Sequence, residues 1–480
     1  MIHKLIHKKS IIKLVVFFSI FSLLSAGFPV PPYYPPVAQA FTVGEEREVG
    51  EKLLSIIRKE FKLLDAPDIS QYVSDLGRDI LKVAGSQYFD YNFFVIENKD
   101  FNAFAAPSGL IFIHSGLIET MNTEGELLGV MAHECAHVTS RHIAERLQKS
   151  AKVNVGTMAL LLAGIMIGAG PISEAMIAGS IATNAAMNLN FSRADEEESD
   201  RLAFSWMQKM GRDPASIVSM LQKMRKISIL QMGDIPPYLL THPDPGLRMN
   251  YVQDLLLTTP EMSYQKNDEF DFQRIKARVL ALTKDAAQLY PKYNKIIADP
   301  QAEPETKAMA YYGLSQVYLE TNELAKAEKS LAETMKLYPD RPILETDLGI
   351  IYFQAGEYGK ALKNFTEAQS KDPDCSYTSF FMAKTLEQKG DKTGALRLYK
   401  QLAITLPTFS EIQYRLGKIL TDTGKPGEAH YHIGIYNWYE GDIETAKYHL
   451  QEAIKVLEKT DPIQNKAQEM LVKIIKFEKN

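Results

Sequence analysis

The sequence predicts a mainly α-helical protein, in which an N-terminal α+β domain with a small sheet precedes a C-terminal solenoid of helix pairs. Three observations predict this fold class. The chain has 480 residues, too many for one ordinary hydrophobic core. Its second half repeats a helical pattern at intervals of 34 residues. Its first half mixes amphipathic helical segments with two short strand-like segments, 91–98 and 109–116.

Residues 1–40 have the pattern of a secretory signal peptide. Four lysines and no acidic residue precede an apolar run of about 15 residues, which is shorter than the ~20 residues that span a bilayer. The small residues of "VAQA", which ends at Ala40, suit cleavage there, although earlier cleavage or retention as an anchor would also fit. We therefore expect export to the periplasm.

The charge and the cysteines narrow the class of protein. Removal of the four N-terminal lysines takes the net charge from −5 to about −9. An acidic exported chain is a poor binder of nucleic acid, so nucleic acids are excluded as partners. The two cysteines, Cys135 and Cys375, fall in different halves of the chain and predict no disulfide framework.

Two polar breaks divide the rest of the chain. Residues 41–262 are expected to form the first domain, which opens with an amphipathic helix at 46–64. The breaks near residues 260 and 300 enclose a helical pattern, so 263–304 is expected to hold one linking helix.

Residues 305–480 carry the internal repeat. Alanine and proline recur at exact 34-residue intervals, at Ala327, Ala361, Ala395 and Ala429 and at Pro339, Pro373 and Pro407. The period resembles tetratricopeptide repeats, whose stacked helix pairs build concave surfaces for peptides and protein partners. After Ala429 the spacing breaks, which predicts a shifted final unit and a capping helix. A generic helical bundle is the alternative, and the exact intervals argue against it.

The stretch "GVMAHECAHVTSRH", Gly129 to His142, contains a candidate metal site. His133 and His137 are four residues apart, so on a helix both imidazoles lie on one face and can reach one ion. A chance match to HExxH is expected in about one such chain in a hundred. The surrounding residues are apolar and lack proline, which favours a helix here. Zinc in a peptidase needs three protein ligands and one open position, so a third ligand is expected elsewhere.

The acidic stretch "FSRADEEESDRLAF" offers that ligand. Glu196 and Asp200 share one face of a helix, so that one would bind the metal while the other would hydrogen-bond to a metal ligand. On its own, this stretch would more often be a solvated acidic helix face.

HExxH, "SRADEEESD" and "THPDPGLR", in this order, resemble the peptidase family that includes the prenyl-protein peptidases and the heat-shock membrane protease. The family's second motif, ExxxD, corresponds to Glu196 and Asp200. The segment 102–118 resembles the family's edge strand, which pairs with extended substrate. The resemblance implies one zinc ion per chain with His133, His137 and Glu196 as ligands, and Glu134 as the general base.

The resemblance also implies roles for three further residues. Asp200 would orient a ligand histidine. His242 and Arg248 match positions that contact the reacting centre, where they would stabilise a tetrahedral oxyanion as hydrogen-bond donors. Alternatively, His242 would close the open zinc position and make the resting enzyme self-inhibited. By residue type alone, His242 is more often a plain loop histidine.

Other features near the motifs are expected to be structural. Cys135 points off the ligand face and is expected to be a packed thiol, and His142 is also off that face. Ser199 stands where the family usually has alanine, and His114, on the expected edge strand, has no evident chemical partner. The uncharged run 153–173 is interrupted by glycines and Pro171, so a buried helix or a membrane-facing flap is favoured over a true span. Histidine and carboxylate ligands favour zinc but do not exclude cobalt or manganese.

These features predict an exported zinc endopeptidase that acts on unfolded or misassembled envelope proteins. The resemblance implies outer-membrane β-barrel assembly and quality control as its setting, with the repeats binding substrate or the assembly machinery. Peripheral membrane association also fits. The alternatives are a chaperone or scaffold with a silent or self-inhibited protease site, and an intramembrane peptidase.

Overall fold

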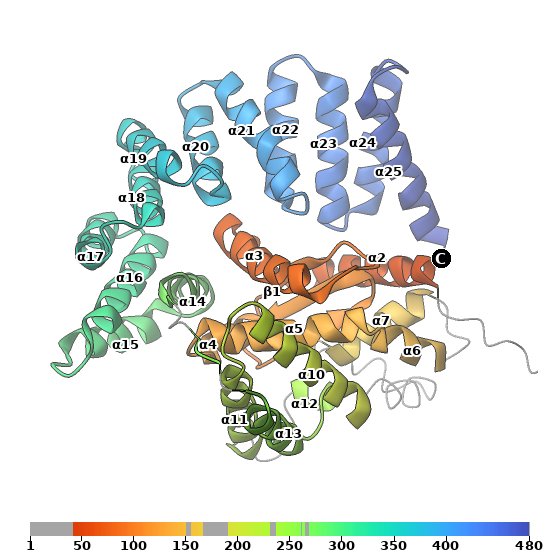
Figure 1. The fold of residues 1–480 in the computed structure, drawn as a ribbon. Coiled ribbons are helices and arrows are strands. Elements are labelled where there is room, and N and C mark those ends of the chain that lie inside the picture. Colours follow the sequence, from red (N-terminus) through yellow and green to blue (C-terminus); the bar gives the residue numbers. More distant parts are fainter. Residues whose placement is uncertain are drawn as a thin grey trace, which may run out of the picture. The chain divides into compact units, whose positions relative to one another are not determined.

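The computed structural model describes residues 42–149, 155–166, 191–230, 237–260, 262–264 and 268–479. It is mainly helical, with a small sheet in the first half and a series of helix pairs in the second, so the predicted fold class is confirmed (Figure 1). The predicted signal peptide lies outside the described residues.

A three-stranded sheet forms the core of the first half. Strand β1 (Asn92–Ile96) pairs in parallel with β3 (Leu110–His114), and β3 pairs antiparallel with β2 (Ala103–Ala106), which gives the order β1-β3-β2. The short 3-10 helix η1 (Pro107–Gly109) joins β2 to β3. Nearly every strand residue is buried, and the rings of Phe104 and Phe112 stack across the antiparallel pair. Strand β2, predicted by the resemblance alone, therefore lies at one edge of the sheet.

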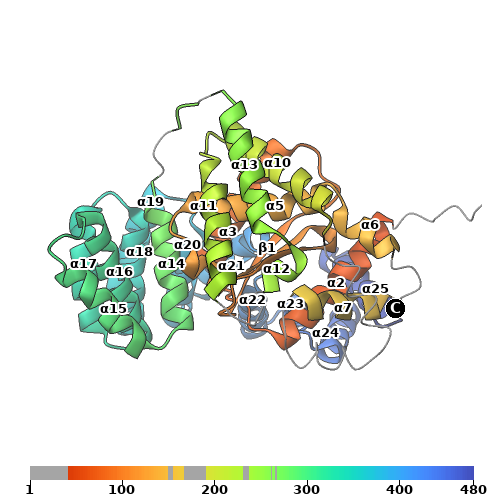
Figure 2. The same ribbon diagram turned by 90° about the horizontal axis from the view of Figure 1, so that it is seen from below.

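Helices cover this sheet. The N-terminal helices are α2 (Val43–Glu60) and α3 (Pro67–Ala84), and α4 (Ser115–Thr120), α5 (Glu124–Thr139) and α6 (His142–Lys149) follow the strands. Further along lie α10 (Arg193–Lys209), α11 (Ala215–Leu230), α12 (Pro237–Thr241) and α13 (Pro245–Thr258). Helix α3 approaches β1 closely because Gly77 has no side chain: a Cβ there would lie 2.1 Å from the Phe93 ring. Figure 2 shows α5 and α10 side by side, and the two helices pack on each other.

The uncharged run 153–173 is described only in part. Helix α7 (Val155–Met166) packs against α2 and buries Met158 and Leu162. Within the described ranges, no helix combines the length and the apolar character needed to cross a membrane.

The segment 263–304 corrects one prediction. It holds two helices, α14 (Phe270–Thr283) and α15 (Ala286–Ala298), where the sequence predicted a single linking helix. The break has a local cause, because the side chain of Asp285 accepts a hydrogen bond from the main-chain N–H of Ala287 and starts α15. Both helices pack on the first helix of the repeat region, so the segment is part of the solenoid's packing.

The second half consists of successive helix pairs. They are α16 (Pro304–Glu320) with α17 (Leu324–Leu337), α18 (Pro342–Gln354) with α19 (Tyr358–Lys371), α20 (Ser376–Gln388) with α21 (Lys392–Thr405), α22 (Ser410–Asp422) with α23 (Pro426–Tyr439), and α24 (Ile443–Val456) with α25 (Pro462–Lys479). The recurring small residues let paired helices approach: a Cβ at Gly349 would lie 2.5 Å from the Phe365 ring. Helix α23 packs on both α22 and α24, so the series continues past the break in spacing.

Buried charges connect the first half to the repeats. Arg274 on α14 donates two hydrogen bonds to Asp347 on α18, at 3.1 and 3.0 Å, and its Nη2 lies 3.2 Å from Asp68 on α3. Arg278, one turn along α14, also donates to Asp68, at 3.1 Å. All four side chains are buried, so this cluster forms a buried ionic junction.

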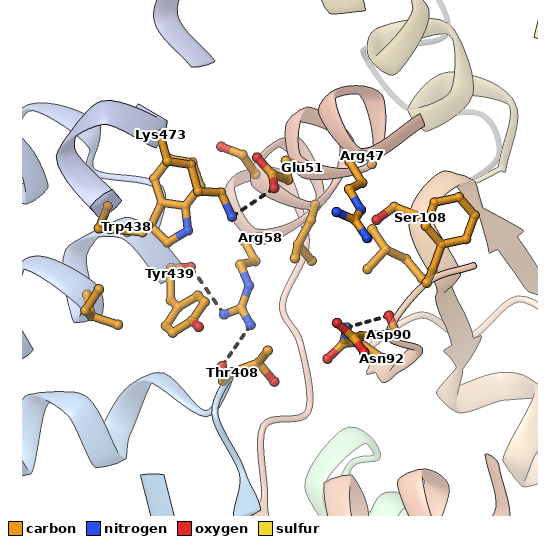
Figure 3. A pocket seen from close by; sticks show the side chains of 17 residues that line it. Arg47, Glu51, Arg58, Asp90, Asn92, Ser108, Thr408, Trp438, Tyr439 and Lys473 are labelled. Carbon is orange, nitrogen blue, oxygen red and sulfur yellow. Dashed lines mark hydrogen bonds and ion pairs between the residues drawn. The ribbon is translucent and has the colours of Figure 1, made fainter. Parts of the chain in front are cut away.

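A second set of contacts borders a pocket of about 390 Å³ (Figure 3). Arg58 on α2 donates to the carbonyl oxygens of Thr408 and Tyr439, at 2.9 and 3.2 Å. Lys473 on α25 pairs with Glu51 at 2.8 Å. The last repeats therefore contact the same helix, α2, that packs against η1.

Candidate metal centre

Local sequence explains how the two motif helices begin. The side chain of Thr123 accepts a hydrogen bond from the N–H of Glu126 and caps α5, which carries His133, Glu134 and His137. Ser192 and Asp195 form a reciprocal capping box at the start of α10, which carries Glu196 and Asp200. Because α5 and α10 pack together, the two motifs meet.

Four donor atoms converge between these helices. His133 Nε2 lies 3.0 Å from His137 Nε2 and 3.3 Å from Nδ1 of His242. Glu196 Oε1 lies 3.3 Å from His137 Nε2 and 2.9 Å from His242 Nδ1. All four side chains are buried, and their ligand atoms lie within 4.8 Å of one another. In the described part of the chain, this is the group that could hold a metal ion.

This geometry fits a zinc ion. Ligand atoms around tetrahedral zinc lie about 3.3 Å apart when each is 2.0–2.1 Å from the metal. The measured separations of 2.9 to 3.3 Å are close to that spacing. Three buried imidazole nitrogens that face one another have few hydrogens to share, whereas one cation would engage all their lone pairs. The residues present therefore suit the group that the motif implies.

Glu134 lies beside the donor atoms and has two hydrogen-bond partners. Its Oε2 accepts from the main-chain N–H of Ala105 on β2, at 2.9 Å. Its Oε1 accepts from the hydroxyl of Tyr238 on α12, at 3.2 Å, and lies 3.6 Å from His242 Nε2. Since the Ala105 N–H points to Glu134, it faces away from β3 and toward the outer edge of the sheet. The carboxylate thus contacts the strand edge and the candidate metal site at once.

Asp200 and Arg248 lie behind the donor atoms. Asp200 Oδ1 is 2.9 Å from His133 Nδ1, the ring nitrogen that faces away from His137. Arg248 donates two hydrogen bonds to Asp200, at 2.7 and 2.8 Å, and its Nη1 lies 2.8 Å from Glu196 Oε2. The guanidinium therefore contacts two carboxylates, whereas the family resemblance implied that it donates to an oxyanion.

The buried charges shift the pKa values of the cluster. Burial alone would raise the pKa of Glu196, but Arg248 and the imidazoles around it lower that pKa well below its usual range. Burial and Arg248 would lower the pKa of His133, but Asp200 outweighs both and raises it to about 9. Burial lowers the pKa of His137 well below its usual range. Glu196 is thus an anion, as a metal ligand must be.

Further side chains pack around the donor set, and one of them, Tyr238, was not predicted from the sequence. His142, expected to be only structural, lies with its Nδ1 3.0 Å from Nδ1 of His137, on the side away from the donor cluster. Ser199 lies next to His142, at 3.5 Å. Tyr238 was not predicted, and its position four residues before His242 was the available signal. By contrast, Cys135 is a buried free thiol outside the donor set, and burial raises its pKa.

Comparisons with known proteins agree with this geometry. Residues 67–256 match the model of peptidase family M48, and residues 308–341 and 346–408 match models of the tetratricopeptide repeat. The chain is similar to the beta-barrel assembly-enhancing protease of Escherichia coli K12, with 27% identity over 65% of this chain and 63% of the relative. It is also similar to the metalloprotease LoiP of the same organism, with 29% identity over 34% of this chain and 62% of the relative.

The chain spans less than two thirds of the length of these curated relatives. The family match nevertheless covers both motif helices and the His242 and Arg248 segment, and the repeat matches cover helices of the second half. Residues 67–256 therefore match peptidase family M48, and the second half contains segments that match tetratricopeptide repeats.

Proposed function

We propose that the chain is an exported zinc endopeptidase that cuts unfolded or misassembled envelope proteins. The observation that carries the proposal is the convergence of four donor atoms beside Glu134, whose carboxylate also touches the outer edge of β2. His133, His137 and Glu196 would hold one zinc ion. That ion would supply Lewis-acid chemistry, which acidifies water and polarises the scissile carbonyl.

The chain's own residues account for the remaining chemistry. Glu134 takes a proton from the attacking water and returns one to the leaving amine, so the base is regenerated in each cycle. Asp200 fixes the His133 ring through Nδ1, and Arg248 neutralises both Asp200 and Glu196. The low exposure of Glu134 keeps bulk water from the base.

Substrate would bind to the edge of β2. In the described part of the chain β2 pairs only with β3, and the outward N–H of Ala105 is held by Glu134. An extended peptide that adds to this edge would take over that donor and lie beside the metal site. Main-chain hydrogen bonds are insensitive to sequence, which suits a protease of unfolded chains.

Three further points support an envelope role. Residues 1–40 have the composition of an export signal. The name of the Escherichia coli relative refers to β-barrel assembly. Tetratricopeptide repeats build surfaces for protein partners, so the second half would bind substrate or the outer-membrane assembly machinery.

A self-inhibited chaperone or scaffold is the second candidate function. It is favoured by the position of His242, whose Nδ1 fills the fourth place of the donor set. Such an enzyme would bind partners through its repeats and cut only when His242 moves away.

The test is hydrolysis of casein, an unfolded protein, by the purified mature chain. We expect cleavage that stops when a chelator removes the metal and returns when one equivalent of zinc is added. Cleavage that persists in the metal-stripped chain would refute the zinc assignment. No cleavage by the wild type, together with cleavage by His242→Ala, would favour the self-inhibited scaffold. To test the substrate class, an unfolded outer-membrane β-barrel protein is compared with its folded form, and only the unfolded form should be cut.

A further inference from the structure

Tyr238 lies at the centre of the site although no motif includes it. Its side chain has no exposed surface, and its hydroxyl donates to Glu134 Oε1 at 3.2 Å. Its ring stacks on the His242 ring, with centroids 4.3 Å apart and planes 20° apart, and Phe101 packs edge-on against it. One tyrosine thus contacts both the base and the residue in the fourth donor position.

The two contacts follow from one helical turn. Tyr238 and His242 are four residues apart, and the His242 N–H donates to the Tyr238 carbonyl oxygen at 2.9 Å. Residues at this spacing lie on the same face of a helical turn, so the side chain of Tyr238 on α12 and that of His242, the residue directly after α12, both point toward α5. The same helical turn therefore places the Tyr238 hydroxyl at Glu134 and the His242 imidazole at the metal site.

The Tyr238 hydroxyl supplies the second hydrogen bond to the carboxylate of Glu134. A carboxylate with one hydrogen bond can still rotate about its terminal torsion, which has broad minima. Glu134 has a different donor on each oxygen, the Ala105 N–H on Oε2 and the Tyr238 hydroxyl on Oε1. Two donors on two oxygens fix the plane of the carboxylate. When a substrate takes over the Ala105 N–H, the Tyr238 hydroxyl is left as the protein donor that holds the base.

The phenol is suited to this task. Its hydroxyl has one hydrogen to donate, and that hydrogen points to Glu134 Oε1 at 3.2 Å. Phenylalanine would fill the same space and keep the stack on His242, but it has no hydrogen to donate.

We propose that Tyr238 is a positioning residue for the peptidase reaction, whose hydroxyl orients Glu134 for proton transfer. This inference rests on the proposed function, because it assigns Glu134 the role of the base. The two parts of the Tyr238 side chain have different contacts: the hydroxyl donates to Glu134, and the ring stacks on His242.

The chain offers a matched control in Tyr72. Its hydroxyl donates to Glu124 Oε2 at 2.9 Å, so it too is a tyrosine bonded to a glutamate of α5, but at the first residue of that helix. Tyr72→Phe therefore removes the same kind of hydrogen bond without touching the site. Casein hydrolysis is measured for Tyr238→Phe and Tyr72→Phe, each with zinc content determined.

We expect Tyr238→Phe to lower kcat roughly tenfold, because a misoriented base transfers its proton slowly, while KM and zinc content stay within about twofold of the wild type. Tyr72→Phe should match the wild type. An unchanged kcat in Tyr238→Phe would overturn the proposal, and so would a loss of activity that follows a loss of zinc.

A stability measurement tests the contact independently of activity. Melting temperatures of the metal-free chain are determined for Tyr238→Phe, Glu134→Ala and the double variant. If the two side chains interact, the change in melting temperature of the double variant differs from the sum of the changes in the two single variants by about 2 °C or more. Tyr72→Phe combined with Glu134→Ala should be additive. Additive shifts for the Tyr238 pair would overturn the contact, whereas an inactive wild type would count against the proposed function alone.

Discussion

Arg248 holds Asp200 through two hydrogen bonds, from Nε to Oδ2 at 2.8 Å and from Nη2 to Oδ1 at 2.7 Å. The same guanidinium lies 2.8 Å from Glu196 Oε2, and Asp200 contacts His133. One buried cation thus connects a candidate metal ligand with the carboxylate that orients another.

Loss of that cation should destabilise the metal-free chain. Arg248→Met removes the guanidinium that pairs with two buried carboxylates, Asp200 and Glu196, which costs about 3–5 kcal/mol in the free energy of unfolding. Urea denaturation measures the change. Arg201→Met is the control, because Arg201 is an exposed arginine that pairs with Glu197 on the same helix, and its loss should change the free energy of unfolding far less than the loss of Arg248. Equal stability of Arg248→Met and the wild type would show that the cation is not needed.

His242 should contribute to metal affinity. Its Nδ1 lies 3.3 Å from His133 Nε2 and 2.9 Å from Glu196 Oε1, so it can bind the same ion as they do. We expect His242→Ala to weaken zinc binding by roughly 10–100-fold in competition with a fluorescent chelator. Unchanged affinity would show that the imidazole does not reach the ion in solution.

The ionic junction should stabilise the contact between the peptidase region and the repeats. Arg274 is buried and bonds to Asp347, with Asp68 also within 3.2 Å, so Arg274→Met leaves buried carboxylates underpaired. We predict a loss of about 3–5 kcal/mol by urea denaturation. Arg397→Met, at an exposed position on α21, should change stability by at most about 0.5 kcal/mol. Similar effects of both substitutions would contradict a structural role for the junction.

His114 should make the fold sensitive to acid. Burial lowers its pKa to about 4. Between pH 6.5 and 4 this histidine is protonated in the unfolded chain and neutral in the folded chain, so the unfolded state binds more protons and stability falls as pH falls. The fall approaches about 1.4 kcal/mol per pH unit, or roughly 3 kcal/mol in all. His114→Leu should remove this part of the pH dependence in urea denaturation between pH 7 and 4. If the free energy of unfolding falls equally with pH in the variant and the wild type, His114 is not the source of the pH dependence.

Spacing within one helix was the most informative feature of the sequence. His133 and His137 on α5, and Glu196 and Asp200 on α10, face the site as a four-residue period requires. The 34-residue period likewise predicted the helix pairs of the second half, because each repeat packs mainly on its neighbours.

Contacts between residues far apart in the sequence could not be predicted from helical spacing. The hydrogen bond of Tyr238 to Glu134 joins α12 to α5 across 104 positions, and no local pattern encodes it. His142 was expected to be structural because it lies off the ligand face, and it is outside the donor set. Its contact with His137 was not predicted, because it depends on the turn at Arg141, which has a φ of 57°. The predicted linking helix was wrong for a different reason: the apolar period continues past Asp285, but α14 ends at Thr283 and Asp285 caps the start of a second helix, α15.

The most direct test of the account compares casein cleavage by the wild type and by Glu134→Gln at equal zinc content. Glutamine keeps the shape of the side chain and can still accept the Tyr238 hydrogen bond, but it cannot take up a proton as a base. We predict that the variant folds, binds zinc as the wild type does, and loses hydrolysis by a factor of roughly 1,000 or more. A Glu134→Gln chain that cuts casein at the wild-type rate would contradict the assignment of Glu134 as the base, and with it the proposed mechanism.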